Sequence, residues 1–320
     1  MRLAGRLLLG LAIVAALAWT LTALQYQGVG VWRVLAQVAA VAVALALGLL
    51  VWRGRSARPL VGLLVAAVVV GLWWSSIKPM ADRDWAEDVA RGVTGKVEED
   101  IVTLRNIRDF TWSTPDTFAP AWRDETLRLS NLKTVDLVTS VWANPAIAHT
   151  LISFGFADGR HIVFSAEIRR EKGEVFSEIG GFFKEFELVL IAATEADIIR
   201  LRSDVRGERV SVFPLQLTAD QREALFRSYI NLGNQLSEKP RFYQTVTSNC
   251  TTIIWRLART VDDRLPLDWR VLLSGYLPGY LHDLGLLEGS LKQALHNARI
   301  APQPDVARED FSRLVRGLQP

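Results

Sequence analysis

The only cysteine of the chain, Cys250, stands at the start of a predicted helix. It follows Asn249, a residue type that caps helix N-termini well, and residues 250–259 have the composition of a helix. Unpaired N–H groups and the helix dipole in a first turn favour a thiolate over a thiol. Since the thiolate is the nucleophile of thioester chemistry, Cys250 is a candidate catalytic residue. The alternative is a small apolar residue buried inertly at the helix start.

A β-hairpin is predicted by two alternating runs, residues 149–156 and 160–168, joined through an Asp-Gly pair. A two-residue turn would mix apolar and polar residues on each face. A three-residue loop with Gly159 in the left-handed region pairs Phe156 with Arg160 instead. One face of the hairpin then collects Ile152, Phe154, Phe156, Ile162, Phe164 and Ile168. Because a slip of one residue exchanges the faces, burial of an all-apolar face favours this second register.

In this register the other face of the hairpin carries side chains that could do chemistry. It collects His149, Ser153, His161, Ser165 and Glu167. His149 lies directly opposite Glu167, with Cβ atoms about 5 Å apart, so the carboxylate can fix the imidazole tautomer and support the imidazolium. His161 lies about 20 Å further along the strand and is not expected to take part. The alternatives are a structural role for His149 and pairing of Glu167 with Arg169 or Arg170.

Other classes of site receive less support from the sequence. Metal binding by Cys250, His149 and His161 would need three dispersed ligands without a characteristic spacing, so we expect no metal and no cofactor. The net charge is only +3 and no basic stripe carries interleaved aromatic residues, so nucleic acid is not an expected partner. A local cluster of arginines is expected to form a solvated face: Arg200, Arg202, Arg206 and Arg209.

Three apolar runs near the N-terminus, residues 7–24, 34–52 and 60–77, each have the roughly 18 to 20 residues that cross a hydrocarbon core. A signal peptide is excluded for the first run because two further spans follow and no cleavage site is evident. The arginines that flank the runs are Arg2, Arg6, Arg53, Arg55 and Arg58. Since positive loops stay cytoplasmic, everything after Lys78 should lie outside the cytoplasm, in the periplasm of a bacterium.

The remaining pattern predicts an α+β chain in four parts. We expect a membrane anchor over residues 1–78, a linker helix over 79–100, a catalytic domain over 101–262 and a C-terminal extension without chemistry of its own over 263–320. Within these parts we expect helices over 82–92, after Glu195, after the cap Thr218 and near 290–299, and strands over 188–193 and 210–215.

Several ordered motifs resemble one bacterial family. They are Ile107-Arg108-Asp109-Phe110-Thr111-Trp112, His149 through Phe156, Ser165-Ala166-Glu167-Ile168-Arg169-Arg170-Glu171, Asp197 through Arg202, and Pro240 through Tyr243 to Asn249-Cys250-Thr251-Thr252. Together they are similar to the N-terminal periplasmic domain of Lnb, the lyso-form lipoprotein intramolecular transacylase, over about residues 100 to 260. The order of histidine, hairpin and Asn-Cys helix also resembles circularly permuted papain-like folds of the NlpC type.

The resemblance implies an antiparallel sheet and a Cys–His pair that maps onto Cys250 and His149. We therefore expect a membrane-tethered cysteine acyltransferase, or a hydrolase of lipid or lipoprotein esters, in the bacterial inner membrane. Within the motifs, the residues predicted to bind the substrate are Asn249, Thr251, Ser165, Arg169 and Tyr243. The chain departs from Lnb because its spans precede the domain. A cell-wall peptidase or amidase and a non-catalytic binding domain remain as alternatives, and the oligomeric state stays open.

Overall fold

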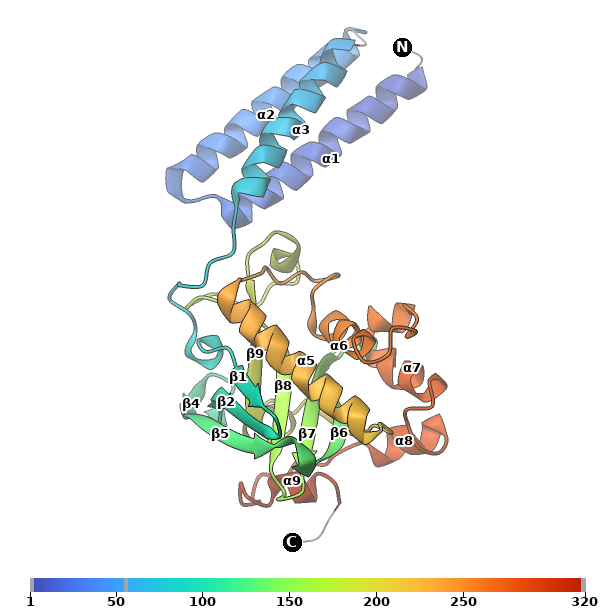
Figure 1. Ribbon diagram of the computed structural model, residues 1–320. Coiled ribbons are helices and arrows are strands. Elements are labelled where there is room, and N and C mark those ends of the chain that lie inside the picture. The colour runs from blue at the N-terminus through green and yellow to red at the C-terminus, as the bar shows by residue number, and fades with distance from the viewer. Residues whose placement is uncertain (1–2, 55–56, 318–320) are drawn as a thin grey trace. The chain divides into compact units, whose positions relative to one another are not determined.

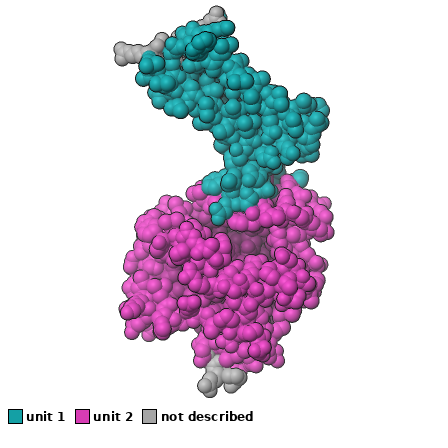
Figure 2. Space-filling view, turned by 180° about the vertical axis from the view of Figure 1, so that it is seen from behind, with its two compact units in different colours: residues 1–80, 177–185 teal, residues 81–176, 186–320 magenta. Residues whose placement is uncertain are grey.

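The computed structural model describes residues 3–54 and 57–317 (Figure 1). Arg2 and Arg55, two of the arginines used to orient the spans, lie outside the described residues. The chain forms two compact units, coloured separately in Figure 2. Unit 1 comprises Met1–Met80 with Ser177–Glu185, and unit 2 comprises Ala81–Phe176 with Phe186–Pro320.

Unit 1 contains three helices that are long and apolar enough to cross a membrane, as the sequence predicts. They are α1 (Leu3–Gln27), α2 (Gly30–Trp52) and α3 (Ala57–Ser76). The segment Ser177–Glu185, which includes the 3-10 turn η3 (Gly180–Phe182), packs on these helices. The Phe183 ring stacks on Tyr26 with ring centroids 5.8 Å apart, and Lys184 Nζ donates to the carbonyl of Trp74 over 2.6 Å. An aromatic and a cation thus fasten this segment to the helix ends.

Unit 2 is built on an eight-stranded mixed sheet. The strand bounds are β1 (Thr94–Glu98), β2 (Ile101–Arg108), β5 (Trp122–Arg128), β6 (Leu132–Val141), β7 (His149–Phe156), β8 (His161–Arg169), β9 (Glu187–Thr194) and β10 (Arg209–Pro214). The order is β1-β2-β9-β8-β7-β6-β10, and β5 pairs with β2 on the side. All pairs are antiparallel except β2 with β9. A separate hairpin joins β3 (Thr111–Thr114) and β4 (Thr117–Ala119).

Helices cover both faces of this sheet. Their bounds are α4 (Glu195–Arg200), α5 (Ala219–Glu238), α6 (Cys250–Arg259), α7 (Leu277–Asp283), α8 (Leu291–Asn297) and α9 (Phe311–Leu314). Shorter turns are η1 (Glu87–Val89), η2 (Leu129–Asn131), the π turn η4 (Leu201–Val205), η5 (Trp269–Val271) and η6 (Ser274–Tyr276). On one face Phe154 and Phe164 of the sheet pack on Phe226 of α5, which lies across the strands in Figure 1. On the other face Val163 shares a core with α4 and α9.

The predicted register of the β7–β8 hairpin is confirmed. Phe154 pairs with Ile162, and the Phe156 N–H donates to the Arg160 carbonyl over 2.9 Å. Gly159 has a φ of +84°, the left-handed conformation that glycine adopts most readily and that the three-residue loop requires. The apolar face lies in the core, so burial selects the register as the sequence argument supposed.

One expectation about the start of the domain is wrong. Residues 82–92 form no α-helix, because the chain there bonds to the sheet: the Ala86 N–H donates to the Arg170 carbonyl and the Val93 N–H to the Leu190 carbonyl. The segment after residue 262, expected to be an extension without chemistry of its own, packs on the domain, since Phe311 is fully buried and Arg316 bonds Glu195 inside the compact unit. The α+β class is confirmed, while the permuted papain-like topology stays a prediction.

Candidate catalytic site

Cys250 is the first residue of α6, as predicted, and its helix start is closed by a capping box. The Asn249 side chain accepts from the Thr252 N–H over 2.8 Å, and the Thr252 hydroxyl accepts from the Asn249 N–H over 2.9 Å. Ile253 anchors the helix in the core. These contacts use the N–H of Thr252, so those of Cys250 and Thr251 are the candidates for binding an oxyanion.

His149 begins β7 and lies against two residues of β8. Its Nε2 lies 2.8 Å from the Ser165 Oγ and 3.1 Å from Glu167 Oε1, while the Ser165 hydroxyl donates to the same carboxylate oxygen over 2.7 Å. Because the serine proton is given to Glu167, Nε2–H is the donor toward both residues. This arrangement leaves the other ring nitrogen, Nδ1, for the thiol. The predicted pairing of Glu167 with His149 is confirmed.

The thiol of Cys250 is half-buried and lies beside His149 and Thr150. Burial raises the pKa of Cys250, but the charge of His149 and hydrogen bonds from His149 and Thr150 outweigh burial and lower the pKa to about 6. The Thr150 hydroxyl is itself fixed by a 3.0 Å hydrogen bond with the Thr251 hydroxyl. At neutral pH the cysteine is therefore a thiolate.

The imidazole is correspondingly held in its charged form. Burial lowers the pKa of His149, but the charges of Glu167 and Cys250 outweigh burial and raise the pKa to about 9. Burial also raises the pKa of Glu167, yet contacts with His149, Arg202 and Ser165 hold it well below its usual range. The site is thus a thiolate–imidazolium pair backed by a carboxylate. Such a pair can attack a carbonyl carbon and protonate a leaving group.

Arg202 is a site residue that the sequence argument missed, and the expectation that it is solvated is wrong. Its side chain is only 6% exposed, and its Nη2 donates to Glu167 Oε1 over 3.1 Å. It lies in the π turn η4 directly after α4, and its Nη1 donates back to the Ile198 carbonyl. Its neighbour Arg200 is half-buried, whereas Arg206 and Arg209 are exposed. A π turn of this kind is rare and is often found at functional sites.

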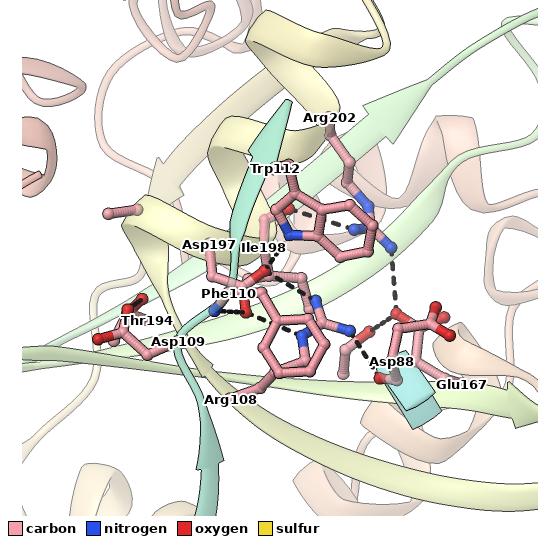
Figure 3. Close-up of polar contacts among 12 residues, drawn as sticks. Asp88, Arg108, Asp109, Phe110, Trp112, Glu167, Thr194, Asp197, Ile198 and Arg202 are labelled. Atoms are coloured by element: carbon pink, nitrogen blue, oxygen red, sulfur yellow. Dashed lines mark hydrogen bonds and ion pairs between the residues drawn. The ribbon is translucent and has the colours of Figure 1, made fainter. Parts of the chain in front are cut away.

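A second buried ion pair holds the helix that precedes Arg202 (Figure 3). Arg108 donates from Nε and Nη2 to the two oxygens of Asp197, over 2.8 and 3.1 Å. The same carboxylate accepts from the Phe110 N–H and from the Trp112 indole. Asp197 is fully buried in α4, so this network fixes α4, and Arg202 reaches Glu167 from the π turn that follows it. The two sequence motifs that contain Arg108 and Asp197 were the feature of the sequence that could have indicated this network.

The residues predicted to bind substrate lie at different distances from Cys250, His149 and Glu167. Ser165 touches both His149 and Glu167, and Thr251 is buried against Thr150. The Asn249 amide is occupied by the helix cap and by the Thr245 carbonyl. Their binding of substrate stays a prediction.

The other two predicted substrate contacts are engaged in packing. Arg169 lies over the Trp85 ring, 4.5 Å from its centroid, and donates to the Ala90 carbonyl. Tyr243 is partly buried and packs against the hydrophobic core of the domain. For these two residues as well, a role in binding stays a prediction.

Among the described residues, one group of potential metal ligands lies away from the thiol. Single ligand atoms of Asp136, His161 and Glu195 lie within 4.8 Å of one another. Arg316 already supplies the positive charge there, donating from its guanidinium to both carboxylates. The carboxylates are therefore paired with an arginine, and the cluster is an ion pair that ties the C-terminal segment to the sheet.

Fold and site together define a membrane protein whose α+β domain carries a cysteine, a histidine and a glutamate in contact. Residues 118–275 match the family model described as the Lnb N-terminal periplasmic domain, and that match includes all three residues. The predicted resemblance to this family is therefore confirmed over residues 118–275. No curated protein and no solved structure matches the chain.

Proposed function

We propose that the protein is a cysteine-dependent acyltransferase, or an ester hydrolase, that acts on a lipid or lipoprotein at the periplasmic side of the bacterial inner membrane. The observation that carries the proposal is the chain of contacts from Cys250 through His149 to Glu167. A thiolate with a pKa of about 6 beside an imidazolium is suited to forming a thioester.

The reaction follows from the geometry. The Cys250 thiolate attacks the ester carbonyl, and backbone N–H groups at the start of α6 are placed to receive the oxyanion. The C–O bond breaks as the His149 imidazolium gives its proton to the leaving alcohol. An amine or water then attacks the thioester, gives its proton to His149, and releases an amide or a carboxylic acid with the free thiolate. Glu167 holds the imidazole in orientation throughout.

The lipid or lipoprotein substrate is supported by two further observations. Three helices suited to crossing a membrane tether the domain, and the matching family is named for a periplasmic domain of Lnb. A cell-wall peptidase or amidase would use the same cysteine and histidine on an amide. A non-catalytic binding domain would have no need of the lowered thiol pKa.

Mass spectrometry of Cys250 tests the proposal directly. The full chain is incubated with bacterial membranes, quenched in acid, and digested. We expect an acyl adduct on Cys250 that hydroxylamine removes, as it removes thioesters, and that is absent from His149→Ala. An adduct with the mass of a peptide fragment would favour the peptidase, and no adduct in the wild type would favour the binding domain.

A further inference from the structure

Residues 267–276 form an amphipathic segment built on the turns η5 and η6. Its inward side chains Val271 and Ser274 are buried. Its large apolar side chains are between 39% and 71% exposed: Leu267, Trp269, Leu272, Leu273 and Tyr276. The Trp269 and Tyr276 rings contact each other with centroids 5.3 Å apart, so the exposed residues are grouped and not scattered. We call these five residues the apolar patch.

The segment is fastened to the strand that carries His149. The Ser274 hydroxyl accepts from the Ala148 N–H over 2.8 Å and donates to the Ala148 carbonyl over 2.7 Å, and Ala148 directly precedes His149. The Gly275 N–H donates to the Ala146 carbonyl over 3.0 Å. A Cβ on Gly275 would lie 1.9 Å from the Pro145 carbonyl oxygen, so only glycine permits this close approach.

The other end of the segment is fastened to the helix that carries Cys250. The indole of Trp255 in α6 donates to the Pro266 carbonyl over 3.1 Å, and the Tyr280 hydroxyl donates to the same oxygen over 2.8 Å. The segment that carries the patch is therefore fastened to the residue before His149 and to the helix that Cys250 begins. The exposed side chains of the patch do not belong to a mobile loop, because both ends of the segment form hydrogen bonds to elements that position the catalytic residues.

A grouped apolar surface beside a nucleophile marks a binding surface for an apolar part of the substrate. Tryptophan and tyrosine are the residues that lie where hydrocarbon meets water, and the chain is tethered to a membrane by three apolar helices. We propose that the apolar patch binds the fatty-acyl chains of a substrate lying in the outer leaflet of the inner membrane. This assignment rests on the proposed acyl chemistry of Cys250 and specifies a long-chain ester as its donor.

Chain-length preference tests the assignment. The full chain in nanodiscs is assayed with p-nitrophenyl butanoate and p-nitrophenyl hexadecanoate. The double variant Leu272→Asp with Leu273→Asp should lower the ratio of long-chain to short-chain rates by about tenfold or more, since two buried methylene groups already account for about that factor. The matched control is Leu295→Asp, an exposed leucine of α8 outside the patch, which should leave the ratio unchanged. An unchanged ratio in the double variant would overturn the assignment.

A second measurement does not depend on turnover. Because Cys250 is the only cysteine, Cys250→Ser gives a background in which one new cysteine can be labelled. A fluorophore at Leu272→Cys, in nanodiscs of phosphatidylethanolamine and phosphatidylglycerol, should be quenched by acyl-chain nitroxide lipids and protected from iodide. The same label at Leu295→Cys serves as the comparison.

The two measurements separate failure of this assignment from failure of the proposed function. Lipid quenching at residue 272 without ester turnover by the wild type would contradict the proposed acyl chemistry but support the contact between the patch and lipid. Turnover by the wild type, together with a label at residue 272 that iodide quenches, would support the acyl chemistry but show that the apolar patch does not bind lipid. Protection from both quenchers would mean that a protein surface covers the patch, and would overturn the assignment.

Discussion

Arg202 donates from Nη2 to Glu167 Oε1 over 3.1 Å, the oxygen that also receives Ser165 and His149. A single carboxylate oxygen thus has a serine hydroxyl, an imidazole and a guanidinium around it. The guanidinium is 6% exposed, so its charge is poorly screened by solvent. This contact links the catalytic group to α4 and to the buried Arg108–Asp197 pair behind it.

Replacement of Arg202 by methionine should alter the pH profile of turnover. The charge of Arg202 lowers the pKa of both His149 and Glu167, so its loss should move the alkaline limb, set by the His149 proton, to higher pH. Turnover near pH 7 should fall by about ten- to a hundredfold as Glu167 loses a positioning contact. Arg200→Met, at the end of α4 and bonded to the Gln303 and Val306 carbonyls, is the control. An unmoved limb in a folded Arg202→Met would contradict the role.

Glu167→Gln should fold and lose most turnover. The carboxylate is the main charge that raises the pKa of His149, so its loss should lower that pKa and shift the alkaline limb to lower pH, opposite to the Arg202 variant. In a serine protease the equivalent loss costs about 10⁴-fold. His161→Ala should retain turnover, because its neighbours are the Gly159 carbonyl and the Asp136–Glu195 cluster, away from the thiol. Equal losses in both variants would argue against an orienting role for Glu167.

The reactivity of the thiol should depend on pH in a defined direction. Because the folded-state pKa of Cys250 is about 6, alkylation by iodoacetamide should rise through pH 6 and level off above pH 7. His149→Ala removes the charge that lowers the pKa and should move the midpoint toward the ordinary value of about 8.5. His282→Ala, a histidine bonded to the Gly289 carbonyl, is the control. A wild-type midpoint near 8.5 would return Cys250 to an inert structural role.

The parts of the site that the sequence predicts are those that depend on local signals. Asn249 and the residues after it specify the helix start, and Gly159 with the alternating runs specifies the hairpin register. Once the register is known, the contact between His149 and Glu167 follows from strand geometry alone. No information about distant parts of the chain is needed for either step.

The parts that the sequence does not predict depend on distant partners. Arg202 belongs to a run of arginines that the sequence predicts to be exposed to solvent. Its burial is explained by its ion pair with Glu167, which lies 35 positions earlier in the chain. The sequence predicts a helix over residues 82–92, but the Ala86 N–H bonds to the Arg170 carbonyl just after β8, and the helical turn there is the three-residue 3-10 turn η1. The segment 267–276 is held next to the strand that carries His149 by the bonds between Ser274 and Ala148, which are 126 positions apart.

Membrane topology can be tested with reporters at the C-terminus. The arginines before the first span and between the second and third predict a cytoplasmic N-terminus and a periplasmic domain. An alkaline phosphatase fused to the C-terminus should therefore be active, while a fluorescent protein that matures only in the cytoplasm should be dark. The same two reporters after residue 54, between α2 and α3, should show the reverse. A bright C-terminal fusion would contradict both the topology and the periplasmic compartment.

The ion pairs of Arg316 should make stability depend on acid. Burial raises the pKa of Glu195, but the charge and hydrogen bonds of Arg316 outweigh burial and lower the pKa to about 2, against 4.5 ordinarily. The lowered pKa means that Glu195 contributes its full stabilisation above about pH 4.5 and loses it as the pH falls toward 2. A shift of this size corresponds to about 3 kcal/mol in the free energy of unfolding.

Arg316→Met should therefore destabilise the domain near pH 7 by about 3 to 5 kcal/mol, because two buried carboxylates lose their cation. Its stability should also fall less on acidification than that of the wild type, since protonation of Glu195 then relieves an unpaired charge. Urea unfolding of the full chain in detergent, followed by tryptophan fluorescence at several pH values, measures both effects. Arg313→Met, at an exposed arginine of α9 three residues earlier, should change the free energy by less than about 0.5 kcal/mol. Equal effects of the two substitutions would show that the Arg316 pairs do not hold the C-terminal segment on the sheet.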